Sequence, residues 1–537
     1  MPASGETGPA GDTLGAMETD PPEERPTDHR TILGNTGQNV LGLGIGAVAT
    51  FVAQVVMTRR LGEARFGVVT FTTQFAFIAA AASRFGMDVA NVRLVATLVG
   101  RGQAARSRAL VRRSVAIAGI VSVALGAAVV LAAPWLAERF TSASEDGPAA
   151  FRAAGVTIPF AALAFTWMGA TRGLKVMRPT LFAQWIAQPI GWIALTILFW
   201  AWVSVSASAA GWAFGASWGV ALAVAWFGWE TRARRLRDVD VTADAGIPQE
   251  HTGALVRFGA LRAPATLFSQ LLFWTDLFVL SILMRDAPDG AAQVGVYSAV
   301  LRAGQSLFLF LTSVSLTFSP FVADLHHRGE GERLDALYKS VTRWTLTATI
   351  PVLLLLAIMP GPVLRVFGPG FADGGDALRI LIVGMIVPVI VGTVGFILIM
   401  AGRTGWDLAV YVASFAIDVG LAWALARPDV LGIRGAATAQ AVTLSFSAVA
   451  RLMLVRRFLG IWPFDAQYAR LLVPAAVGAA VMAGVAALVP DARWGVELLV
   501  AGGGGGLAYA AVALAVGLSR EERATLASAA RRVRGRG

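Results

Sequence analysis

Two charged residues lie deep inside hydrophobic stretches near the middle of the chain. Asp276 lies in the apolar stretch 267–283, and Arg302 lies in the apolar stretch 295–322. A charge at the centre of a bilayer costs from about 3 to more than 10 kcal/mol, so such residues normally face a cavity or pair with one another. The intervening turn is short, so two antiparallel helices would hold both side chains at a similar depth. The spacing predicts either an ion pair or a polar pathway that both residues line.

The elements that hold these residues belong in a membrane. Of the 537 residues, 56% are hydrophobic and 15% are charged, whereas soluble proteins carry about 25% charged residues. Apolar stretches of the ~20 residues that a spanning helix needs recur along the whole chain and give about fourteen helices. Strands of a membrane barrel would alternate in polarity and be half as long. The sequence therefore predicts an all-α polytopic membrane protein.

The basic residues predict how these helices are oriented. With the N-terminus in the cytoplasm, 33 Lys and Arg residues fall in inner segments and 11 in outer segments. Inner loops are the more basic ones in membrane proteins, so both termini are expected in the cytoplasm. The net charge of +11 follows from this topology, and nucleic acid is not expected as a partner.

Similar residues recur in the same order 227–229 positions apart. Gly67 and Gly295 end the first loop of each half, and Pro159 and Pro388 lie early in later helices. Such pairs indicate that helices 1–6 recur as helices 7–12, although chance matching among Gly-rich loops is the alternative. Because each half has an even number of helices, the two six-helix lobes would run parallel. This is one design of secondary transporters, with the substrate site between the halves.

The repeat and the loops predict the organisation of the whole chain. The segments are a disordered cytoplasmic tail at 1–33, an N-terminal lobe at 34–230, a cytoplasmic linker at 231–252, a C-terminal lobe at 253–460, two further helices at 461–519 and a basic cytoplasmic tail at 520–537. No loop is large enough for a catalytic domain, and there is no GxxxxGK[ST] phosphate-binding loop, so neither an enzyme nor direct use of ATP is expected. The chain has no cysteine, and no metal or cofactor is expected.

Four segments of the chain carry a family resemblance. They are 275–284 (TDLFVLSILM) with 294–303 (VGVYSAVLRA), 60–67 (RLGEARFG), 366–372 (VFGPGFA) and 431–437 (LGIRGAA). They resemble the polysaccharide biosynthesis (Wzx-type) flippases of the multidrug/oligosaccharidyl-lipid/polysaccharide (MOP) exporter superfamily, over roughly residues 35–460. The resemblance implies a two-lobed, fourteen-helix fold that works by alternating access. A multidrug/cation antiporter or a lipid II flippase of the same superfamily is the alternative.

The resemblance also implies a cargo. Flippases of this type move polyprenyl-diphosphate-linked oligosaccharides across the bacterial cytoplasmic membrane for surface polysaccharide biosynthesis. Arginine suits a diphosphate because its planar guanidinium stays charged and binds two oxygens at once. Arg302 is therefore the first candidate ligand, with Asp276 as its resting partner or, in the alternative, as the partner of a purely structural pair. Arg84, Arg257 and Arg262, at the inner ends of helices 2 and 7, could receive the diphosphate or could simply anchor the topology.

Two further acids are candidates for energy coupling. Asp418 lies within the eleventh predicted helix, and Asp407 lies near its start. Either could bind a coupling proton or cation, and the alternative is a buried, hydrogen-bonded acid. Membrane lipid is the other expected partner, and the protein is expected to act as a monomer.

Overall fold

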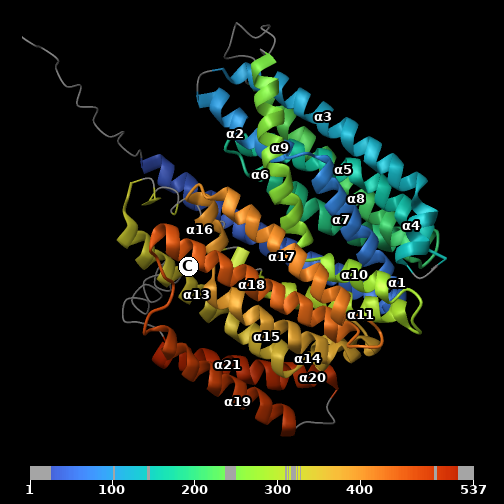
Figure 1. Cartoon of the computed structure of the whole chain (residues 1–537), viewed down its shortest axis with the longest axis vertical. Coiled ribbons are helices and arrows are strands. Elements are labelled where there is room, and N and C mark those ends of the chain that lie inside the picture. Colours follow the sequence, from blue (N-terminus) through green and yellow to red (C-terminus); the bar gives the residue numbers. More distant parts are fainter. Residues whose placement is uncertain are drawn as a thin grey trace, which may run out of the picture.

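The computed structural model is helical throughout the part of the chain that it describes (Figure 1). It describes residues 26–517 except 101–102, 142–144, 236–248, 309–310, 313, 316–321, 323–324, 327 and 489–492, and it describes side chains from Gly44 onwards, apart from several helical positions that include Arg262. Most of the expected tail at 1–33, the linker at 231–252 and the tail at 520–537 therefore lie outside the described residues. α1 begins at Pro26, before the expected end of the first tail.

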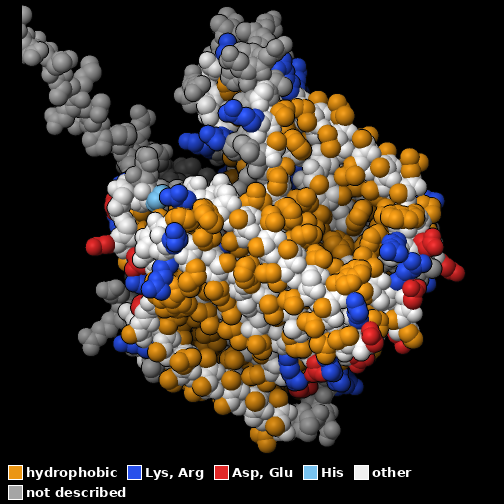
Figure 2. All heavy atoms as spheres, in the orientation of Figure 1, with side chains coloured by type: hydrophobic (Ala, Val, Ile, Leu, Met, Phe, Trp, Pro, Cys, Tyr) orange, Lys and Arg blue, Asp and Glu red, His pale blue; other side chains and the backbone are white. Residues whose placement is uncertain are grey.

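Eleven helices in the described ranges are long and apolar enough to cross a membrane, and one bent pair makes a twelfth. α1 contains two of the expected crossings, because Gly62 breaks it with a φ of 72° that favours glycine. The expected crossing at 294–322 runs into residues that are not described. Figure 2 shows hydrophobic side chains over most of the visible face and charged side chains gathered at its margins. The predicted all-α membrane class is confirmed.

The first half of the chain forms one group of helices around α5. Its elements are α1 (Pro26–Ser83), α2 (Met87–Gly100), α3 (Ala104–Leu131), α4 (Ala133–Phe140), α5 (Gly147–Gly173), α6 (Arg178–Thr180), the π-helical turn η1 (Leu181–Ala187), α7 (Gln188–Trp202) and α8 (Ala207–Arg235). α5 packs against α1, α2, α3 and α8. Glycines allow this close packing, since a Cβ atom on Gly155 would lie 2.7 Å from the Gly126 carbonyl oxygen.

The second half forms a group of helices around α11, α15 and α18. Its elements are α9 (Gln249–Leu271), α10 (Thr275–Leu283), α11 (Gly290–Gln305), α13 (Gly331–Ile358), α14 (Pro360–Arg365), η2 (Pro369–Gly374), α15 (Gly375–Val391), α16 (Val394–Met400), α17 (Thr404–Leu425) and α18 (Ile433–Leu459). α15 packs against α11, α13 and α18, and α17 packs against α18. The division into two lobes remains a prediction. In Figure 1, α3, α5 and α8 of the first half lie above α13, α15 and α18 of the second.

The last helices lie along the edge of the second group, beside α13 (Figure 1). They are η3 (Tyr468–Leu471), α19 (Leu472–Leu488), α20 (Trp494–Glu497), η4 (Leu498–Gly502), α21 (Gly503–Val512) and η5 (Ala513–Gly517). Gly478 and Gly505 bring α19 and α21 together, because a Cβ atom on Gly505 would lie 2.9 Å from the Gly478 carbonyl oxygen. The Tyr509 hydroxyl donates a hydrogen bond of 2.8 Å to the Thr347 carbonyl of α13.

The seventh crossing is bent by 55° between α9 and α10. α9 packs against α1 and α2 of the first half and against α17 of the second half. α10 packs against α11, α17 and α18. The carbonyl of Leu272, in the break, accepts a hydrogen bond of 3.1 Å from the Gln440 side chain of α18. The crossing that carries Asp276 therefore contacts both halves along its length, because α10 also packs against α4 of the first half.

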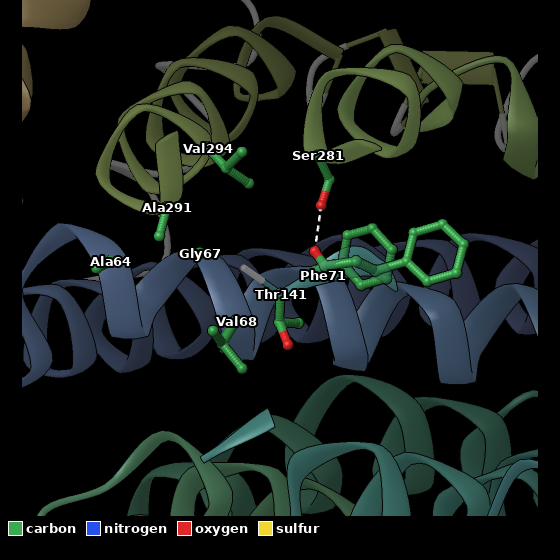
Figure 3. A pocket seen from close by; sticks show the side chains of 9 residues that line it. Ala64, Gly67, Val68, Phe71, Thr141, Ser281, Ala291 and Val294 are labelled. Carbon is green, nitrogen blue, oxygen red and sulfur yellow. Dashed lines mark hydrogen bonds between the residues drawn. The ribbon is translucent and has the colours of Figure 1, made fainter. Parts of the chain in front are cut away.

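α1 and α11 meet where the repeat-related glycines face one another. A Cβ atom on Gly67 would lie 2.9 Å from the Gly295 nitrogen, and one on Gly295 would lie 1.8 Å from the Glu63 carbonyl oxygen. Figure 3 shows Gly67 of α1 facing Ala291 and Val294, whereas Val68 points away from them; the void lined by these residues is only about 10 Å³. Two equivalent residues in contact are what a twofold axis between the halves produces, which supports the predicted repeat.

Further contacts join the halves at the same end of the molecule. The Ser281 hydroxyl donates a hydrogen bond to the Phe140 carbonyl (Figure 3). The Arg59 guanidinium donates one of 2.9 Å to the Val366 carbonyl. We call this set of contacts, together with Gly67 and Gly295, the outer closure, because the predicted topology places it on the outer side.

Candidate functional site

A cavity of about 500 Å³ lies between the two halves, beside the break in the seventh crossing. It is lined by Ala47, Thr50, Phe51, Gln54, Trp185, Gln270, Phe273, Trp274, Arg302, Gln305, Ser306, Phe308 and Thr312. These residues come from α1, η1, α9, the break, and α11 with the residues that follow it. Aromatic walls with a few polar groups are typical of small-molecule sites. This cavity has one arginine and three glutamines in its lining.

Arg302 faces this cavity and not the acid beside which it was expected to rest. Its guanidinium carbon lies 4.6 Å from the centroid of the Trp274 ring, a cation–π distance. Its Nε has no hydrogen-bond partner among the described residues. A buried donor without a partner costs about 1–3 kcal/mol. Arg302 is therefore held by a ring that leaves at least one N–H group free for a ligand.

Asp276 is turned away from Arg302, so the expected ion pair between them is not formed. Asp276 is fully buried, and its Oδ2 accepts a hydrogen bond from the Tyr297 hydroxyl. Tyr297 and Arg302 are five residues apart on α11, which places them about 140° apart around the helix. The two charges therefore lie on different faces of the structure around α11. The expected pair of Asp276 with Arg302 is therefore replaced by a contact of Asp276 with Tyr297 and of Arg302 with Trp274.

Asp276 instead lies beside Asp418 of α17. The two acids interact electrostatically, and the backbone amide of Asp276 lies close to the Asp418 carboxylate. Both are fully buried, and Thr443 of α18 donates a hydrogen bond of 3.3 Å to Asp418 Oδ1. Oδ1 of Asp276 and Oδ2 of Asp418 have no hydrogen-bond partner in the described ranges. Two buried carboxylates that interact in a low dielectric repel one another unless a proton or a cation lies between them.

Asp407, the other acid singled out by the sequence, is engaged in an ion pair. Its Oδ1 accepts a hydrogen bond of 2.8 Å from Nε of Arg451 on α18, and both residues are buried. The sequence did not single out Arg451, which lies on α18. One signal could have found it, because Gln440, Ser447 and Arg451 recur at 7 and 11 residues, on one face of the helix. Asp407 is therefore not a free acid in this conformation.

The three arginines predicted at the cytoplasmic mouth are placed differently from one another. Arg84 is buried in the first half, where its Nε lies 3.4 Å from Asp88 Oδ2 and its guanidinium covers the Phe165 ring. It is not among the residues that line the cavity of Arg302. Arg257 lies on α9 with an exposed side chain, and the side chain of Arg262 lies outside the described residues. The structure thus brings none of these described side chains to Arg302, and their substrate roles remain predictions.

Comparison with known proteins identifies the family. A family model described as polysaccharide biosynthesis protein matches residues 32–326, more than half of the chain. The chain belongs to this family. The matched range includes Arg302, Trp274 and Asp276, whereas Asp407, Asp418 and Arg451 follow it. No curated protein sequence matches this member of the polysaccharide biosynthesis family.

Solved structures show that this family member has the fold of the MOP exporters. It is similar to a multidrug resistance MATE family transporter of the MOP superfamily in an inward-facing conformation, with a TM-score of 0.65 and 16% identity, over 79% of this chain and 98% of that chain. It is also similar to the lipid II flippase MurJ in an inward closed conformation, with a TM-score of 0.64 and 12% identity, over 88% of this chain and 97% of that one. A MOP superfamily transporter from Pyrococcus furiosus gives a TM-score of 0.54 at 15% identity, over 79% and 95% of the two chains.

These identities are low, so they establish the fold and leave the cargo open. The polysaccharide biosynthesis family that the sequence motifs resemble is confirmed, and the fold is that of the MOP exporters. The shared fold also agrees with an arrangement in which the cavity of Arg302 lies between two halves. The chemistry of that cavity then has to be argued from its own residues.

Proposed function

We propose that this protein is a flippase that moves polyprenyl-diphosphate-linked oligosaccharides across the bacterial cytoplasmic membrane, as a monomer with both termini in the cytoplasm. The observation that carries the proposal is the cavity between α1 and α11, where Arg302 has a free Nε donor. A cation in the core of a membrane protein is expensive unless it serves a ligand or a partner. Arg302 has an aromatic ring beneath it and no acid paired with it among the described residues.

The lining of the cavity suits the head of such a lipid. Arg302 would bind the diphosphate oxygens, because a guanidinium forms two parallel charge-assisted hydrogen bonds with a phosphate. Gln54, Gln270 and Gln305 line the same cavity and would bind sugar hydroxyls, since an amide side chain both donates and accepts hydrogen bonds. The polyprenyl tail would remain in the bilayer while the polar head crosses between the halves.

Alternating access would require the outer closure to separate. Gly67 and Gly295 are in tight backbone contact. A packed interface of this kind forms or breaks as a unit. In the conformation described here the cavity lies behind this closed contact. Loading from the cytoplasmic side and release on the outer side would then alternate as the outer closure forms and breaks.

The buried acids offer a coupling site next to the substrate site. Asp276 and Asp418 would hold a proton or a monovalent cation between them, through the two carboxylate oxygens that lack partners. Asp276 lies two residues after Trp274, whose ring covers Arg302. Gain or loss of positive charge at the acids would therefore act on the residue that holds the substrate-binding arginine in place.

Transport of a fluorescent polyprenyl-diphosphate oligosaccharide in proteoliposomes tests this proposal. Arg302→Gln should lower the flipping rate roughly 10- to 100-fold, because one hydrogen bond to a charged group is worth about 1.5–3 kcal/mol. Arg333→Gln is the matched control, since the Arg333 side chain is 74% exposed and pairs with the neighbouring Glu330. Normal flipping by the Arg302 variant would overturn the assignment.

A multidrug/cation antiporter is the second candidate, because two buried acids could also bind an organic cation. Such a protein would exchange a fluorescent organic cation for protons in the same vesicles, and Arg302→Gln would leave that exchange intact. Lipid II added as a competitor tests the remaining alternative. If lipid II inhibits flipping at concentrations at which other glycolipids do not, the protein would be a lipid II flippase.

A further inference from the structure

A second pocket, of about 300 Å³, adjoins the cavity of Arg302 in the second half of the molecule. The two share Phe273, Phe308 and Thr312 in their linings, so they are immediate neighbours with no helix between them. The second pocket continues from these residues to α16, α17 and α18. None of its acids or arginines belongs to the coupling site formed by Asp276 and Asp418.

Arg451 is fixed in the wall of this pocket by contacts on three sides. Its Nε donates to Asp407 Oδ1 at 2.8 Å. Its Nη1 donates to the Ser447 hydroxyl, and its guanidinium carbon lies 4.2 Å from the centroid of the Tyr411 ring. Such contacts orient a guanidinium firmly, because its donors are fixed in one plane.

One group of Arg451 remains unused. Arg451 is only 7% exposed, and its buried Nη2 has no hydrogen-bond partner in the described part of the chain. A second unused group lines the same pocket, the hydroxyl of Thr393, which is 2% exposed and equally without a partner. Buried polar groups in proteins are nearly always hydrogen-bonded, so two such groups in one pocket indicate a ligand.

The charge of the pocket decides which kind of ligand fits. Asp407 is 1% exposed and neutralises Arg451, so a second anion here would be repelled by a buried carboxylate. The free Nη2 donor and the Thr393 hydroxyl instead suit uncharged oxygens that accept and donate hydrogen bonds. The walls contain Phe273, Phe308 and Phe396, and aromatic walls with few polar groups are typical of sites for organic ligands.

We propose that Arg451 and Thr393 form a subsite for an uncharged sugar residue of the transported glycan, next to the diphosphate at Arg302. Nη2 of Arg451 donates a hydrogen bond to a sugar hydroxyl or to an acetamido carbonyl, and Thr393 bonds a neighbouring hydroxyl. Asp407 acts as a positioning residue that holds the guanidinium edge toward the pocket. This inference rests on the proposed function, because it needs a glycan in the adjoining cavity.

Binding measurements with two lipids test the subsite separately from the proposed function. The probes are a polyprenyl diphosphate that carries no sugar and the same lipid carrying an uncharged disaccharide, each titrated into purified full-length protein in nanodiscs. Arg451→Lys keeps a cation beside Asp407 but removes Nη2. It should weaken binding of the glycosylated lipid about tenfold and leave binding of the sugar-free lipid unchanged.

Thr393→Val is the second variant, because it keeps the shape of the side chain, removes only the hydroxyl and leaves every charge in place. It should weaken the glycosylated lipid by about three- to tenfold and leave the sugar-free lipid unchanged. Arg302→Gln is the comparison, and it should weaken both lipids. If the Arg451 and Thr393 variants lost the same affinity for both lipids, or lost none for either, the subsite would be overturned. The role of Arg302 as a diphosphate ligand would be unaffected by that result. Failure of the unmodified protein to bind either lipid would overturn the proposed function and the subsite with it.

Discussion

Gly295→Ala should open the outer closure. The added methyl carbon would lie 1.8 Å from the Glu63 carbonyl oxygen and 2.5 Å from its carbonyl carbon. Both atoms belong to the backbone of α1, so no side-chain rotation relieves the clash, and α1 and α11 must move apart. Overpacking of this kind costs about 1–3 kcal/mol. The closed conformation alone bears this cost, so the ratio of open to closed molecules should rise about 5- to 150-fold.

The absence of cysteine from the chain makes this change directly measurable. Cysteines introduced at Glu138 and Asp286, whose side chains are 70% and 92% exposed, report the outer separation of the halves through spin-label distances. Gly295→Ala should increase the population at long distances. Gly420→Ala is the matched control, because a Cβ atom at Gly420 of α17 would meet nothing within 4 Å. Identical distance distributions in the two variants would refute the argument that close backbone contact keeps the outer side closed.

Two further predictions concern the break in the seventh crossing. Asp418→Asn removes one charge from the acid pair, so it should abolish the stimulation of flipping by a proton or cation gradient. Binding of the sugar-free polyprenyl diphosphate should remain. Gradient-driven flipping at the normal rate would exclude Asp418 from coupling. Trp274→Leu should weaken diphosphate binding about three- to tenfold, since a desolvated cation–π contact that orients Arg302 is worth about 0.5–2 kcal/mol. Unchanged binding in the Trp274 variant would mean that Arg302 needs no ring to hold it.

The fold was largely predictable because lipid imposes simple rules on sequence. Apolar stretches of sufficient length mark the crossings, and the repeated glycines at 67 and 295 anticipate the contact between the halves. The breaks were less visible. The stretch 257–283 carries no proline between Pro264 and its end, yet the helix bends between Leu271 and Thr275, and hydrophobicity gives no signal for this bend.

The residues of the site were predictable from the sequence, but the directions in which their side chains face were not. Asp276 and Arg302 were recognisable from the sequence because a charge inside an apolar stretch stands out. Which face each occupies depends on the bend before Thr275 and on the rotation of α11, which a sequence without an alignment does not specify. Arg451 and Asp407 are 44 residues apart on helices that the sequence treats separately, so their pairing follows only from how α17 and α18 pack.

The position of α9 between the halves has a consequence for the order of events in transport. α9 touches α1 and α2 on one side and α17 on the other, and α10 packs against α11, α17 and α18 and also against α4. A change in the angle between α9 and α10 would alter the torsions of residues 272–274, where Trp274 supports Arg302. Occupancy of the cavity and rotation of the halves then act on the same few backbone bonds. Contact of a ligand with the Trp274 ring and the angle between α9 and α10 are therefore expected to depend on one another.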